Sequence, residues 1–216
     1  MSGKQAKILS DTEVNQLLHF ARRTRNPLRN RVIVLLSAKA GMRAGEIAAL
    51  TWDMVLDPQS QIGSVIELRD SAAKKGSGRL IPIHPDLAKA LAAWRKASGR
   101  KSSGRKSSGR KSSGRKSSGL KSSADSTYVV RSERGGQMTP LSVVVWFNRA
   151  FHKVGLKGCS SHSGRRTFIT RAARLVHRAG GSLRDVQLLA GHRSIQTTQR
   201  YIDGDSDAQR RLVSLI

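Results

Sequence analysis

The sequence has one cysteine, few aromatic residues and no long apolar run. A lone cysteine, Cys159, cannot form an internal disulfide, which agrees with a reducing compartment. No apolar stretch approaches the length of a membrane span, and residues 1–10 are polar and basic, without the apolar segment of a signal peptide. Aromatics make up only 4% of the chain, so we expect a core of Leu, Ile, Val and Ala. These absences predict a cytoplasmic globular protein.

Acidic residues are also scarce. The 216 residues contain 40 Lys and Arg against 14 Asp and Glu, a formal net charge of +26. Such a chain attracts polyanions. Nucleic acid is the first expected partner and an anionic membrane surface the second.

Part of this charge lies in a repeat at residues 98–123. The pentad Gly-Arg-Lys-Ser-Ser starts at Gly99 and recurs three times, and the block carries nine basic residues and no acid. It cannot bury enough apolar surface to fold alone, so we expect a flexible basic segment. Either it is a tolerated loop expansion, or it contacts DNA phosphates as an electrostatic arm. The rest of the chain remains strongly basic without it.

The remaining sequence reads mostly as helix. Ser10 followed by Glu13 forms a capping box, and apolar residues then recur at helical spacing. The predicted fold class is mainly α with a small antiparallel β-sheet (α+β), in one domain over residues 10–216 behind a basic tail at 1–9. Helices are expected to start at Ser10 and to cover about 28–40, 44–50, 86–96, 140–154, 162–178, 182–190, 195–202 and 206–215, with strands at 64–68, 79–83 and 127–131.

Two motifs in the second half of the chain place cations near a tyrosine. His162 and Arg165 are three residues apart, so a helix would present them on one face. A guanidinium fork fits phosphate oxygens, and an imidazole adds a titratable donor. Further on, Gly191-His192 precedes Tyr201 by nine residues. A tyrosine beside His and Arg in a basic domain is a candidate nucleophile.

Two further motifs lie in the first half. Arg43 stands between two predicted helices, and Glu46 lies one turn later, where it can orient the guanidinium. Lys74 and Lys75 lie in the turn between the two predicted strands at 64–68 and 79–83. A lysine at a hairpin tip can reach into a DNA groove. Taken singly, each motif also fits an ordinary surface pair or a solvated turn.

Together the four motifs, in this order, resemble the tyrosine recombinase (phage integrase) family. The resemblance covers about residues 10–97 and 125–205, and it includes Leu50-Thr51-Trp52-Asp53 and the stretch from Val186 to Tyr201. Four ordered motifs rarely coincide by chance. The family implies a catalytic domain that breaks and rejoins DNA strands through a 3′-phosphotyrosyl intermediate.

The resemblance implies roles for six residues. Tyr201 would attack the scissile phosphate, while Arg43 and Arg165 would hold its non-bridging oxygens. His162 would act as a proton acceptor or a positioning group. These residue types suit the chemistry, because preorganised donors stabilise the negative charge of a phosphoryl transition state.

The resemblance also implies roles for His192 and Lys74. His192 would donate a hydrogen bond to the phosphate, and Lys74 would protonate the leaving 5′-oxygen. Lys74 is preferred to Lys75 because it lies eight residues before Pro82, a spacing common in the family. Basic side chains beside the motifs are expected to contact double-stranded DNA: Lys75, Arg79, Arg166 and Arg193. The sequence has no HExxH motif, no cysteine pair and no phosphate-binding glycine loop, so no metal or ATP is expected.

The chain departs from the family pattern in three places. Arg166 and Asp203 stand where histidines often occur, and the first catalytic-domain helix starts at Ser10, which leaves no room for the usual N-terminal core-binding domain. The resemblance implies self-assembly on DNA as a tetrameric synapse, and the missing domain suggests an accessory DNA-binding protein as a further partner. The expected location is the cytoplasm, at the nucleoid. Two alternatives stay open: an integrase-like DNA-binding module that cannot recombine alone, and an enzyme like the type IB topoisomerases.

Overall fold

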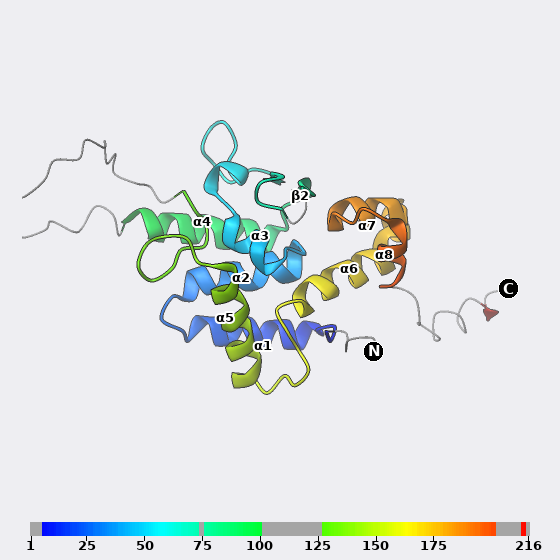
Figure 1. Ribbon diagram of the computed structural model, residues 1–216, viewed down its shortest axis with the longest axis horizontal. Coiled ribbons are helices and arrows are strands. Elements are labelled where there is room, and N and C mark those ends of the chain that lie inside the picture. The colour runs from blue at the N-terminus through cyan, green and yellow to red at the C-terminus, as the bar shows by residue number, and fades with distance from the viewer. Residues whose placement is uncertain (1–5, 74–75, 101–126, 202–212, 215–216) are drawn as a thin grey trace, which may run out of the picture.

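A computed structural model describes residues 6–73, 76–100, 127–201 and 213–214 (Figure 1). Within these residues the fold is mainly helical with one two-stranded antiparallel sheet, which confirms the predicted class. Strands β1 (Val65–Leu68) and β2 (Arg79–Pro82) pair with Ile66 opposite Ile81. The helices, with 3₁₀ turns marked η, are α1 (Asp11–Arg22), α2 (Pro27–Lys39), α3 (Ala44–Ala49), η1 (Trp52–Met54), α4 (Pro85–Arg100), α5 (Pro140–Lys153), α6 (Ser163–Leu175), η2 (Val176–Ala179), α7 (Leu183–Ala190) and α8 (Ile195–Gln199).

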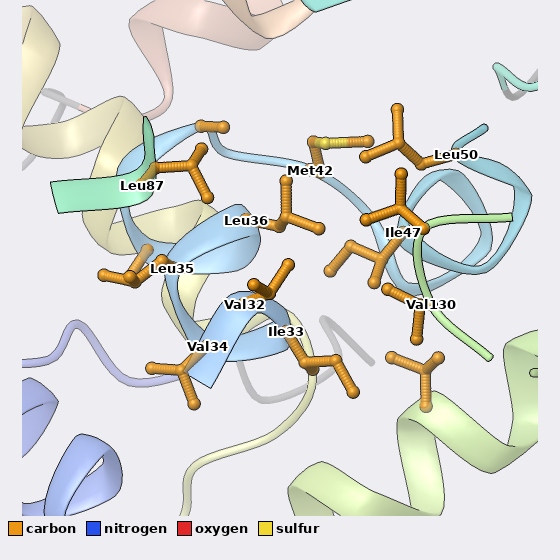
Figure 2. Packing of buried hydrophobic residues seen from close by; sticks show 14 of the residues in the cluster. Val32, Ile33, Val34, Leu35, Leu36, Met42, Ile47, Leu50, Leu87 and Val130 are labelled. Atoms are coloured by element: carbon orange, nitrogen blue, oxygen red, sulfur yellow. The ribbon is translucent and has the colours of Figure 1, made fainter. Parts of the chain in front are cut away.

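Helix α2 forms the centre of the fold. Every residue from Val32 to Ala38 is buried, so this helix is covered on all sides rather than on one stripe. Helices α1, α4 and α6 pack around it, and α3 packs on α5 (Figure 1). The aliphatic side chains of α2 meet Met42, Ile47 and Leu50 in a core with few aromatic rings, as expected (Figure 2).

A second, smaller core joins α6, η2 and α7. It is built from Ile169, Ala173, Val176, Val186 and Ala190. Helices α7 and α8 lie together beyond the end of α6, and α7 also touches β2 (Figure 1). This small core holds α7 against α6, and Tyr201 packs on it.

Most predicted boundaries are confirmed within one or two residues, including the Ser10–Glu13 capping box of α1. The predicted strand at 127–131 is wrong, because only single bridges form there, between Thr51 and Tyr128 and between Arg131 and Gln137. Val129 and Val130 are buried, but their neighbours are loops too short to build a ladder. Helix α4 continues to Arg100, into the start of the repeat. Most of the repeat and the predicted last helix lie outside the described residues.

Candidate active site

A cavity of about 400 Å³ lies where α3, α6 and α8 come together. Five of the six predicted catalytic residues line it, so segments far apart in the sequence contribute to one cavity. Its walls are formed by Ala6, Arg43, His162, Arg165, Arg166, His192, Thr197, Arg200 and Tyr201.

Arg43 precedes α3 and is held by Glu46. The Glu46 carboxylate accepts hydrogen bonds from the Arg43 backbone N–H, at 2.9 Å, and from Arg43 Nη1, at 2.6 Å. Burial alone would raise the pKa of Glu46, but hydrogen bonds and the charges of Arg79 and Arg43 bring it below its ordinary value. Glu46 is therefore ionised at neutral pH and orients Arg43, as the sequence predicts.

Arg79 differs from its expected role as a DNA contact. Its side chain is only 5% exposed, and its guanidinium pairs with Glu46 through Nη2, at 2.9 Å. Its Nε also donates to the carbonyl of Leu189 at 2.8 Å. Because these donors face the protein interior, Arg79 joins β2 to α3 and α7.

Arg165 is a buried residue of the cavity lining, only 4% exposed. Nη1 donates to the Gly41 carbonyl and Nη2 to the Ala190 carbonyl, each at 2.6 Å. Burial, followed by the charges of Arg43 and Arg79, lowers the pKa of Arg165 to about 10, so it stays charged at neutral pH. Two fixed carbonyls therefore aim this guanidinium before any ligand arrives.

Gly164 explains how α6 brings Arg165 to this position. A Cβ at residue 164 would stand 2.3 Å from Ser37 Oγ on α2. Only the absence of a side chain lets the start of α6 rest on α2. The glycine in the His162–Arg165 motif is thus explained by packing.

His192 follows directly on the turn that ends α7. Gly191 has a left-handed φ of +61° and a neighbour, Arg79, that leaves little room for a side chain. The His192 ring lies between Thr198 Oγ1, 3.0 Å from Nδ1, and Arg165 Nη2, 3.2 Å from Nε2. Burial and the charges of Arg165, Arg43 and Arg79 lower the pKa of His192 to about 4. The imidazole is therefore neutral at pH 7.

Tyr201 is half-buried and stacks on His192. Their ring centroids are 5.5 Å apart and the planes differ by 22°. The Tyr201 backbone N–H donates to the Thr198 carbonyl at 3.0 Å, and the ring packs against the small C-terminal core. The structure thus brings Tyr201 together with Arg43, His162, Arg165 and His192.

The other predicted site residues differ in how exposed they are. His162 is exposed at the start of α6, and Arg166 is half-buried in the cavity wall with a buried Nε that has no hydrogen-bond partner among the described residues. Arg193 is exposed beside the cavity residues. Lys74 and Lys75 lie outside the described residues.

Reasoning from the sequence does not identify the observed contribution of three residues to the site: Arg79, Thr198 and Arg200. It predicts Arg79 as a DNA contact, although its place on β2, opposite Leu68, puts it near the buried face of the hairpin. The motifs do not point to Thr198 or Arg200, although both lie within three residues of Tyr201. For Thr198 the sequence does offer one signal, because this residue precedes Tyr201 by three positions, about one helical turn.

No metal site or membrane helix is found in the part of the chain that the structure describes. No three His, Cys, Asp or Glu side chains there gather closely enough to hold a metal ion. None of the helices in residues 6–73, 76–100 and 127–201 is long and apolar enough to cross a bilayer.

The fold is similar to that of solved recombinases. A structure of XerA recombinase superposes with a TM-score of 0.67 at 24% identity, covering 96% of this chain and 64% of XerA. A lambda integrase fragment, solved as a dimer bound to a COC′ core site, gives 0.63 at 18% identity, covering 95% and 62%. At such identities the likeness shows the shared fold.

Relatives by sequence agree. Tyrosine recombinase XerC of Xanthomonas campestris pv. campestris (strain B100) is 26% identical over 199 residues, which cover 92% of this chain and 51% of that XerC. XerC of Myxococcus xanthus is 28% identical over 175 residues, covering 81% and 50%. The chain therefore spans about half the length of the curated relatives it matches. The model of the phage integrase family matches residues 7–207, and the chain belongs to that family.

Proposed function

We propose that this chain is a site-specific DNA recombinase or integrase domain, in which Tyr201 breaks and rejoins DNA strands. One observation carries the proposal: Tyr201 lines the same cavity as Arg43, His162, Arg165 and His192. These are the groups that a phosphodiester and its attacking nucleophile require.

In the proposed reaction the Tyr201 oxygen attacks phosphorus. The bond from phosphorus to the 5′-oxygen breaks, and a 3′-phosphotyrosyl link forms. Arg43 and Arg165 hold the non-bridging oxygens, and His162 accepts or positions the tyrosine proton. Lys74 protonates the leaving 5′-oxygen. Attack by a 5′-hydroxyl on the phosphotyrosine then restores a DNA strand, so rejoining needs no other source of energy.

The electrostatics of the cavity support an anionic substrate. The described residues of its walls include four arginines and two histidines and no carboxylate. The acid beside it, Glu46, is neutralised by its pairs with Arg43 and Arg79. Donors held in place by protein carbonyls, as Arg165 is, need little reorganisation when charge develops on the phosphate.

The proposed partner is double-stranded DNA, which Lys75, Arg166 and Arg193 contact through its phosphates. Relatives by fold were solved on DNA, including lambda integrase as a dimer on a core site. From the family resemblance we propose that this chain assembles into a tetramer on DNA, in the cytoplasm at the nucleoid. An accessory DNA-binding protein is a further proposed partner.

Trapping a covalent adduct in cells tests this function without a known target site. The wild-type protein and Tyr201→Phe are expressed, the cells are lysed under denaturing conditions, and DNA attached to the protein is sequenced. Adducts at discrete sites in the wild type alone are expected. Scattered adducts would favour an enzyme like the type IB topoisomerases, and no adduct with intact DNA binding would favour a binding module.

A further inference from the structure

The two ring nitrogens of His192 face partners of different chemistry. Nε2 lies 3.2 Å from Arg165 Nη2, and Nδ1 lies 3.0 Å from Thr198 Oγ1. A guanidinium can only donate hydrogen bonds, so Nε2 is the acceptor in this contact and carries no hydrogen. A neutral imidazole keeps one ring hydrogen, which therefore sits on Nδ1 and is donated to the Thr198 hydroxyl.

A bound phosphate reverses this requirement. Phosphate oxygens accept hydrogen bonds, and Arg165 would donate to them as well. Because Nδ1 is turned toward Thr198, only Nε2 can reach an anion beside Arg165, and it must then carry the hydrogen. Nδ1 then carries no hydrogen and becomes an acceptor. The group beside Nδ1, which before accepted a hydrogen bond from it, must now donate one.

A hydroxyl meets both needs, because it can accept one hydrogen bond and donate another. A carboxylate or a carbonyl would only accept. Thr198 is fully buried on α8, so water does not replace its hydroxyl. Its carbonyl also accepts the Tyr201 backbone N–H at 3.0 Å. One residue thus contacts both the His192 ring and the backbone of the proposed nucleophile.

We propose that Thr198 is a positioning residue that lets His192 change tautomer when the cavity binds a phosphate. One proton leaves Nδ1 and another joins Nε2, both exchanged with water, and the Thr198 hydroxyl rotates to donate to Nδ1. The ring charge is unchanged. The role of this change in DNA cleavage rests on the proposed function, whereas the change itself requires only an oxyanion in the cavity.

Nitrogen NMR of the full chain tests the assignment. Imidazole ¹⁵N shifts of His192 are recorded near pH 7 in phosphate-free buffer and again with inorganic phosphate. The free wild type should show the hydrogen on Nδ1, and phosphate should move it to Nε2. Thr198→Ser should behave alike, whereas Thr198→Val, which removes the hydroxyl at nearly constant shape, should lose this response.

Thr170→Val is the matched control. Thr170 is equally buried, and its hydroxyl has no partner among the described residues. The same chemical change there should leave the His192 signals and their phosphate response as in the wild type. A wild type with its hydrogen on Nε2 in the free state, or a Thr198→Val variant that still responds to phosphate, would overturn the assignment.

Adduct formation connects the tautomer to function. The yield of Tyr201-linked DNA should fall about tenfold in Thr198→Val, the equivalent of one missing hydrogen bond, and should recover in Thr198→Ser. An unreduced yield in Thr198→Val would contradict the catalytic part of the proposal. If the wild type itself forms no adduct, the proposed function fails, and the NMR result still decides the role of Thr198.

Discussion

Gly164 on α6 and Ser37 on α2 are in such close contact that no side chain fits between them. A Cβ at residue 164 would lie 2.3 Å from Ser37 Oγ and 3.0 Å from Ser37 Cβ. The Ser37 hydroxyl is itself buried without a hydrogen-bond partner in the described residues. This contact sets how closely α6, and with it Arg165, approaches Gly41.

Gly164→Ala is therefore expected to push α6 away from α2. We expect a loss of about 1–3 kcal/mol in the free energy of unfolding, the usual cost of overpacking. Adding Ser37→Ala, which removes the nearest atom, should recover part of it. Urea denaturation measures both. Gly45→Ala in α3 is the control. Apart from its chain neighbours and the backbone of its own helix, no atom of the described residues lies within 4 Å of the position its methyl group would take, so it should be neutral or slightly stabilising.

Arg79 and Arg193 form a second pair of contrasting variants. Arg79→Met leaves the buried Glu46 with one cation instead of two, so unfolding should become easier by about 3 kcal/mol. Arg193→Ala, on the exposed surface, should leave the free energy of unfolding nearly unchanged but weaken the salt dependence of DNA binding. If Arg79→Met instead kept its stability and reduced DNA affinity alone, Arg79 would be a DNA contact after all.

The lowered pKa of His192 predicts a loss of stability in mild acid. Its ordinary value is 6.5 and its value in the fold is about 4, so below pH 6.5 the unfolded chain binds a proton that the folded chain does not. The free energy of unfolding should therefore fall as pH drops from about 7 to about 5, above the range where carboxylates titrate. His192→Asn should flatten this decline. An equal decline in both proteins would assign it to other groups.

The positive charge of the basic repeat predicts a contribution to the salt dependence of DNA binding. Eight Lys and Arg lie between Lys101 and Lys121, both included. Replacing them with serine at constant length should reduce the slope of log affinity against log salt by about 0.9 for each phosphate that the protein no longer neutralises. An unchanged slope would identify the repeat as a loop expansion without a role in DNA binding.

Local patterns in the sequence predict most of the helices and the membership of the site. The capping residues of α1 and the ordered motifs around Arg43, His162 and Tyr201 are local, so they can be read without a fold. Arg79 could not be assigned this way, because its partners Glu46 and Leu189 lie 33 and 110 residues away. A basic residue next to a hairpin turn looks exposed until the packing of α7 is known.

The strand expected at 127–131 fails for a related reason. Its β-branched residues, Val129 and Val130, do occupy the core. A strand also needs a neighbour of matching length, however, and here the neighbours are the short segments around Thr51 and Gln137. Propensity indicates burial correctly but cannot identify the partner.

Identifying the side chain to which DNA becomes covalently attached is the most direct test of the proposed chemistry. Arg200 precedes Tyr201, so trypsin releases a peptide of residues 201–210 with the tyrosine at its start. Adducts purified from cells are treated with nuclease and trypsin, and this peptide is sequenced by mass spectrometry. We expect a nucleotide joined through its 3′-phosphate to Tyr201. A nucleotide on any other side chain, or its persistence in Tyr201→Phe, would contradict the assignment of Tyr201 as the nucleophile.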